Sequence, residues 1–144
     1  MTIKHLTVQQ AREDQQAGAT YLDVRSIPEF EQGHPEGAFN VPLMHVDPAT
    51  RQMRPNAEFV DVVRANFPPD TKLVVGCQMG GRSQKAAEML ANAGYRDVAN
   101  VLGGYGGAPQ MGHTGWVQAG LPVEERADAG RKYDTLHRKA GHSR

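Results

Sequence analysis

The sequence predicts an α/β domain with a mainly parallel sheet, because short apolar runs alternate with longer runs of helical periodicity. Two further observations support this class. The run KLVVG at 72–76 is continuous and apolar, as expected of a strand that is buried on both faces of a parallel sheet. A length of 144 residues with 39% hydrophobic content also suits one domain with a core of its own.

Five short runs are predicted to form strands, at 3–6, 20–24, 38–42, 72–76 and 98–102. Helices are expected between several of them. Thr7 is a candidate N-cap for a helix over 8–17 that ends at Gly18. Ser26 and Pro28 then open a short helical turn that continues to Gln32.

Two longer helices are predicted in the second half of the chain. Asn56 is a candidate cap for a helix over 57–67, where apolar residues recur at helical spacing. A second helix is predicted over 83–93, with Gly94 as its stop. From Glu124 onward the sequence is charged and mixed in sign, which favours a solvated tail at 124–144, helical or frayed, over a partner-binding arm.

The composition excludes several classes of function. Sixteen Lys and Arg balance sixteen Asp and Glu, so we expect neither nucleic acid nor a membrane surface as a partner. The start of the chain lacks the layout of a secretion signal, and the single cysteine forms no internal disulfide, which predicts a cytoplasmic protein. The histidines show no zinc-like spacing, and GGYGGAP fails the dinucleotide pattern, so no metal or cofactor is expected.

The single cysteine lies in the turn CQMGGRS at 77–83, between the strand at 72–76 and the following helix. In a parallel sheet this turn lies at the carboxyl edge, where ligands collect. Loop amides and a helix start favour a thiolate at Cys77. Gly80 and Gly81 permit tight geometry, and Arg82 offers a planar fork of donors to an anion. Ser83 is a candidate helix cap and donor to the sulfur.

A lone cysteine is often only a small core residue. Here the turn position, the glycine pair and Arg82 favour catalysis instead.

Ordered motifs along the chain resemble those of single-domain rhodaneses, a family of sulfurtransferases. The matching blocks are YLDVR at 21–25, GHPEGA at 33–38, NVP at 40–42, CQMGGRS at 77–83, VLGG at 101–104, Trp116 and GLP at 120–122. The resemblance covers Ile3 to Val123, which predicts a rhodanese domain at 1–123 and a rhodanese-like five-stranded sheet flanked by helices.

The resemblance implies that Cys77 carries sulfane sulfur as a persulfide, taken from thiosulfate or a similar small donor. Cyanide, a thiol or a protein then accepts that sulfur. Gln78, Met79, Gly80, Gly81, Arg82 and Ser83 are the predicted substrate-binding residues. Four residues separate Cys77 from Arg82, a spacing typical of rhodaneses, whereas related phosphatases and arsenate reductases use one more. A non-catalytic rhodanese-like binding module is the main alternative.

Other residues have structural interpretations. The resemblance places Asp23 and Arg25 near the base of the loop, where an ion pair or structural hydrogen bonds are expected before substrate contact. His34 is expected to serve packing. The segment 105–115 separates the glycine pair from Trp116 by more residues than in the family. Either this insert borders the Cys77 loop, with Gln110, Met111 and His113 shaping access, or it is a surface elaboration. The sequence leaves the oligomeric state open.

Overall fold

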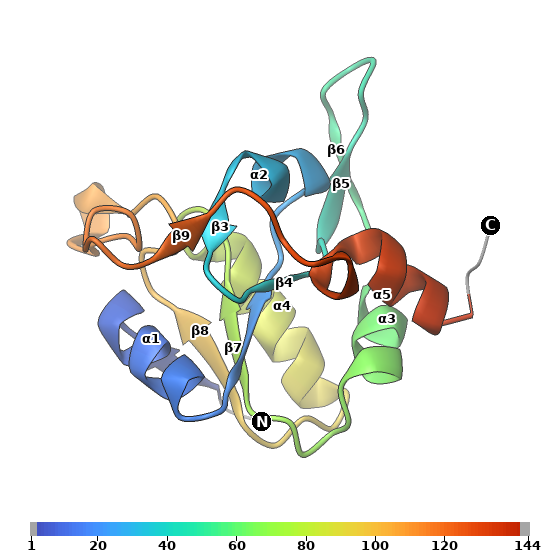
Figure 1. The fold of residues 1–144 in the computed structure, drawn as a ribbon, viewed down its shortest axis with the longest axis horizontal. Helices are drawn as coiled ribbons and strands as arrows, with labels where there is room; N and C mark the ends of the chain where they lie inside the picture. Colours follow the sequence, from blue (N-terminus) through green and yellow to red (C-terminus); the bar gives the residue numbers. More distant parts are fainter. Residues whose placement is uncertain (1–2, 142–144) are drawn as a thin grey trace.

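The computed structural model describes residues 3–141 and shows a central five-stranded sheet between helices (Figure 1). Its strands lie in the order β1 (Lys4–Leu6), β8 (Val98–Val101), β7 (Leu73–Gly76), β2 (Thr20–Asp23) and β4 (Phe39–Asn40). Every neighbouring pair is parallel. The predicted α/β class with a mainly parallel five-stranded sheet is confirmed, and the five predicted strands are all present.

The sheet carries an apolar core on each face. The flanking helices are α1 (Val8–Gln16), α2 (Ile27–Gln32), α3 (Phe59–Asn66), α4 (Gly81–Asn92) and α5 (Tyr133–Lys139). Because consecutive strand residues point to opposite faces, Leu22 and Val75 join a core with residues of α3, α4 and α5. Tyr21 and Val74 face the other core, with Trp116 and residues of α1. Figure 1 shows α1 and α4 on opposite sides of the sheet.

Two predicted helix starts are confirmed by their caps. Thr7 accepts a hydrogen bond from the N–H of Gln10, and the Gln10 side chain accepts from the N–H of Thr7. Ser26 and Glu29 form the same reciprocal arrangement at the start of α2. Each arrangement satisfies two backbone donors that a helix start leaves unpaired.

Two other predicted starts are wrong in detail. α3 begins at Phe59 rather than next to Asn56, because the Asn56 amide joins Pro42 and Tyr133 while its oxygen accepts the N–H of Glu58. α4 begins at Gly81, two residues earlier than predicted. Gly80 is its N-cap, with a φ of 120° that few side chains tolerate.

Several short elements were not predicted, since two or three residues carry too little periodicity. β3 (His34–Pro35) pairs with β9 (Val123–Glu124), and β5 (Met44–Val46) pairs with β6 (Met53–Pro55) in a hairpin that projects from the fold in Figure 1. Two single-turn helices are η1 (Pro109–Met111) and η2 (Ala129–Arg131).

The C-terminal segment is helical, as considered, but the expectation that it is solvated is wrong for one face. Tyr133 and Leu136 of α5 are 8% and 1% exposed and belong to the core beside α3. Asn66 also donates to the Leu136 carbonyl at 2.8 Å. The boundary between 1–123 and 124–144 stays a prediction, and residues 142–144 lie outside the described part. Within 3–141, every helix is too short or too polar to cross a bilayer.

Candidate active site

Cys77 follows β7 directly and lies at the carboxyl edge of the parallel sheet, as predicted. Its Sγ accepts a hydrogen bond from the N–H of Gly80 at 3.1 Å. The residue is only 2% exposed and contacts the core beside α4. The sulfur is therefore buried within its loop, and a backbone donor at the start of a 12-residue helix is directed at it.

The insert at 105–115 borders the loop at 77–83, here called the Cys77 loop, which confirms that part of the prediction. The N–H groups of Tyr105 and Gly106 donate to the carbonyls of Cys77 and Gln78 at 2.8 and 2.9 Å. Gly104 has a φ of 55°, and a Cβ there would lie 2.9 Å from the Gln78 carbonyl carbon. The loops come together because β7 and β8 are adjacent parallel strands. The chain entering the insert thus fixes the backbone that carries the sulfur.

Arg82 lies in the first turn of α4, and a carboxylate that sequence reasoning did not single out as functional holds its side chain. Its two terminal nitrogens donate to the two oxygens of Glu29 at 2.8 and 3.0 Å. Burial alone would raise the pKa of Glu29, but hydrogen bonds from Arg82 and Ser26 and the charge of Arg82 lower it to about 2. The hydrogen bonds that Arg82 donates to Glu29 in turn raise the pKa of Arg82 above its usual value. The S-x-x-E spacing of Ser26 and Glu29 signals only the cap of α2, whereas the contact with Arg82 joins residues 53 positions apart.

Arg25 and Asp23 form the buried ion pair that was expected near the loop. The guanidinium makes hydrogen bonds of 2.8 to 3.2 Å to both Asp23 oxygens and one of 2.7 Å to the Gly33 carbonyl. It reaches Gln78 Oε1 at 3.4 Å and lies 4.3 Å from the centre of the Tyr105 ring. Burial opposes the charged form, but Asp23 outweighs burial and raises the pKa of Arg25. This pair therefore anchors one side of the Cys77 loop.

Ser83 does not cap α4, which was the role predicted for it. It is fully buried inside α4, and its Oγ lies within hydrogen-bond distance of Asn100 Oδ1 and the Gly80 carbonyl. Because Gly80 already forms the N-cap, Ser83 instead ties α4 to β8. His34 stacks on Phe30 with ring centres 3.7 Å apart, in line with its expected packing role. The substrate contacts predicted for residues 78–83 stay predictions.

Two cavities flank the Cys77 loop. A polar cleft of about 360 Å³ is lined by Arg25, Glu29, Gln32, Gly33, Gln78 and Tyr105. On the other side lies a groove of about 350 Å³, lined by Met79, Gly80, Gly81, Gln84, Asn100, Leu102, Gly103, Ala108, Met111 and His113. We call the second one the methionine groove. Met111 and His113 therefore lie beside the loop as considered, whereas Gln110 does not line this groove.

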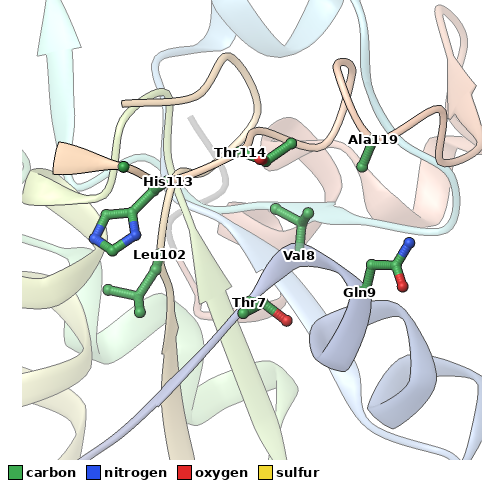
Figure 2. A pocket seen from close by; sticks show the side chains of 8 residues that line it. Thr7, Val8, Gln9, Leu102, His113, Thr114 and Ala119 are labelled. Carbon is green, nitrogen blue, oxygen red and sulfur yellow. The ribbon is translucent and has the colours of Figure 1, made fainter. Parts of the chain in front are cut away.

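A third cavity, of about 490 Å³, lies between the start of α1 and the insert (Figure 2). Leu102 and His113 line both this cavity and the methionine groove, so they form the wall between the two. Figure 2 shows their side chains on the side away from Gln9 and Ala119. In residues 3–141, no group of three or more His, Cys, Asp or Glu side chains could hold a metal ion.

Residues 7–107 match the family model of the rhodanese-like domain. The chain therefore belongs to the rhodanese-like family, and rhodanese-type sulfur transfer is supported at the level of that family. The family model ends inside the insert, at residue 107.

Named relatives agree with this assignment. The chain is 41% identical over 108 residues to thiosulfate sulfurtransferase 16, chloroplastic, of Arabidopsis thaliana, covering 75% of this chain and 82% of that protein. It is 31% identical over 124 residues to thiosulfate sulfurtransferase GlpE of Haemophilus influenzae, covering 86% and 97%. The crystal structure of Rv0390 from M. tuberculosis superposes with a TM-score of 0.73 at 27% identity, covering 88% of this chain and all of that one.

Proposed function

We propose that this protein is a sulfurtransferase that carries sulfane sulfur as a persulfide on Cys77, taking it from thiosulfate or a similar donor. The observation that carries the proposal is the Gly80 N–H directed at Cys77 Sγ, within a loop that places four residues between the cysteine and Arg82. A backbone donor and a helix start stabilise negative charge on sulfur in both the resting and the loaded state.

The reaction is a double displacement. The Cys77 thiolate attacks the outer sulfur of thiosulfate, the sulfur–sulfur bond of the donor breaks, and its electron pair leaves with sulfite. Cyanide then attacks the outer sulfur of the persulfide, which leaves as thiocyanate and returns the electron pair to Cys77. Since the chain has no second cysteine, the persulfide is passed to another molecule rather than closed into a disulfide.

Burial of Cys77 is consistent with this role. At 2% exposure, Cys77 admits only the end of a small donor. We assign to Arg82 the role of holding the anionic part of the donor. A guanidinium has five N–H donors, and the pair with Glu29 uses two of them. The proposal includes a reducing compartment, with the cytoplasm as the predicted one, because the lone thiol must stay reduced.

Intact mass spectrometry tests the proposal against its alternatives. After incubation with thiosulfate, the protein is expected to gain one sulfur atom that cyanide removes, and Cys77→Ser is expected to gain none. A protein that gains no sulfur and releases no thiocyanate is a binding module instead. Hydrolysis of an aryl phosphate would indicate phosphatase chemistry, which the length of the loop disfavours.

A further inference from the structure

We infer that the methionine groove binds the organic part of a small, uncharged, apolar thiol, and that such a thiol is a preferred acceptor of the Cys77 sulfur. This inference rests on the proposed function, because it names the class of acceptor that the loaded cysteine serves. It assigns a role to Met79, Met111 and the insert, which that function does not use.

The groove lies next to the reacting sulfur. Gly80, one of its lining residues, donates the hydrogen bond to Cys77 Sγ at 3.1 Å. The opposite wall comes from the insert, through Ala108, Met111 and His113. The insert is held in place, since Gly106 donates to the Gln78 carbonyl, and Ala108 and His113 exchange backbone hydrogen bonds of 3.0 and 3.1 Å. A ligand in the groove would thus contact the fixed wall of the insert on one side. On the other side it would contact Gly80, which is hydrogen-bonded to Cys77 Sγ.

The side chains select for an apolar ligand. Met79 and Met111 are 48% and 69% exposed, an unusual state for large apolar residues on both sides of one groove. Methionine is flexible and polarisable, so it adapts to ligands of irregular shape. A volume of about 350 Å³ is also within the range of small-molecule pockets.

Charge argues in the same direction. Of the described residues that line the groove, none is an Asp, Glu, Lys or Arg, and His113 is the single titratable group. Neither Arg25 nor Arg82 lines this groove. A carboxylate or ammonium on the acceptor would lose water in this groove without gaining a partner, which is costly.

The transfer step balances without an additional reagent. The acceptor sulfur attacks the outer sulfur of the Cys77 persulfide anion, and a new sulfur–sulfur bond forms. The old bond to Cys77 breaks and leaves its electron pair on the Cys77 thiolate. The thiol proton ends on the terminal sulfur of the new organic persulfide.

Acceptor kinetics with the preloaded protein test the inference. We expect the second-order rate constant, relative to that for cyanide, to rise from ethanethiol to propanethiol to butanethiol by about fourfold for each methylene buried. 3-Mercaptopropionate, similar in size to butanethiol but charged, is expected to react far more slowly than butanethiol. Equal relative rates along the alkyl series would overturn the inference while the gain of sulfur from thiosulfate still upheld the proposed function.

A pair of methionine variants provides the matched control. Met111→Glu places a carboxylate in the groove and is expected to lower the butanethiol-to-cyanide ratio roughly tenfold. Met53→Glu makes the same change on β6, at 43% exposure and outside the groove, and is expected to leave the ratio unchanged. The same ratio in Met111→Glu and the wild type would contradict the inference.

Direct binding gives a readout that does not depend on turnover. With ¹³C-labelled methionine methyl groups, titration with the unreactive butyl methyl sulfide is expected to shift the signals of Met79 and Met111 and to leave that of Met53 in place. If Met79 and Met111 do not respond up to the solubility limit of the thioether, the groove does not bind small apolar sulfur compounds and the inference fails.

Discussion

Replacing Glu29 by glutamine tests the ion pair that holds Arg82 beside the Cys77 loop. The carboxylate pKa falls from 4.5 to about 2 on folding, a difference equivalent to ~3 kcal/mol at about 1.4 kcal/mol per unit. Because the Glu29 side chain is 30% exposed, solvent screening reduces the usable stabilisation to about 1–2 kcal/mol. We expect Glu29→Gln to lower the free energy of unfolding by that amount at pH 7, measured by urea denaturation.

The sign of the pH dependence follows from the lowered pKa. The carboxylate stabilises the fold fully above about pH 4.5, and this contribution is lost as the pH falls toward 2. The difference between wild type and Glu29→Gln should therefore shrink to less than half of its neutral value by pH 3. Glu36→Gln is the control, because Glu36 pairs with Arg12 at 53% exposure and such pairs contribute only a few tenths of a kcal/mol. A difference that stays constant between pH 7 and pH 3 would refute the reasoning.

Three further predictions concern the loop and the C-terminal helix. Arg82→Ala should slow loading from thiosulfate about tenfold more than transfer from the preloaded persulfide to a neutral thiol, and equal losses in the two half-reactions would contradict the donor role. Gly104→Ala forces a Cβ against the carbonyls of the Cys77 loop, so the rate of sulfur transfer should fall about 100-fold. Gly130→Ala is the control, because open space surrounds Gly130, and it should leave the rate of sulfur transfer unchanged. Leu136→Ala should destabilise the fold by about 2–4 kcal/mol in urea denaturation, because this side chain is 1% exposed, and a loss under 1 kcal/mol would show that α5 contributes little.

The strands and the position of the cysteine could be predicted from the sequence because both depend on local patterns. A continuous apolar run such as 72–76 identifies a buried strand by itself, and the turn after it lies at the carboxyl edge of any parallel sheet. The burial of Tyr133 and Leu136 could not be predicted in this way. These two apolar side chains stand in a charged segment, and the face that receives them is made by α3, some 70 residues earlier in the chain.

The charge balance around Cys77 also could not be predicted from local patterns, and it changes the electrostatic interpretation of the site. From the sequence, Arg82 was expected to offer its planar fork of donors to an anion beside the sulfur. In the fold, Glu29 meets Arg82 from α2, and Asp23 meets Arg25 at the end of β2, so each cation is balanced by a carboxylate. Oriented backbone dipoles, those of the Gly80 N–H and of the start of α4, act on Sγ beside these two paired cations. Such dipoles are fixed when the loop folds, which is why the glycines and the contacts from Tyr105 and Gly106 matter as much to the site as its arginine.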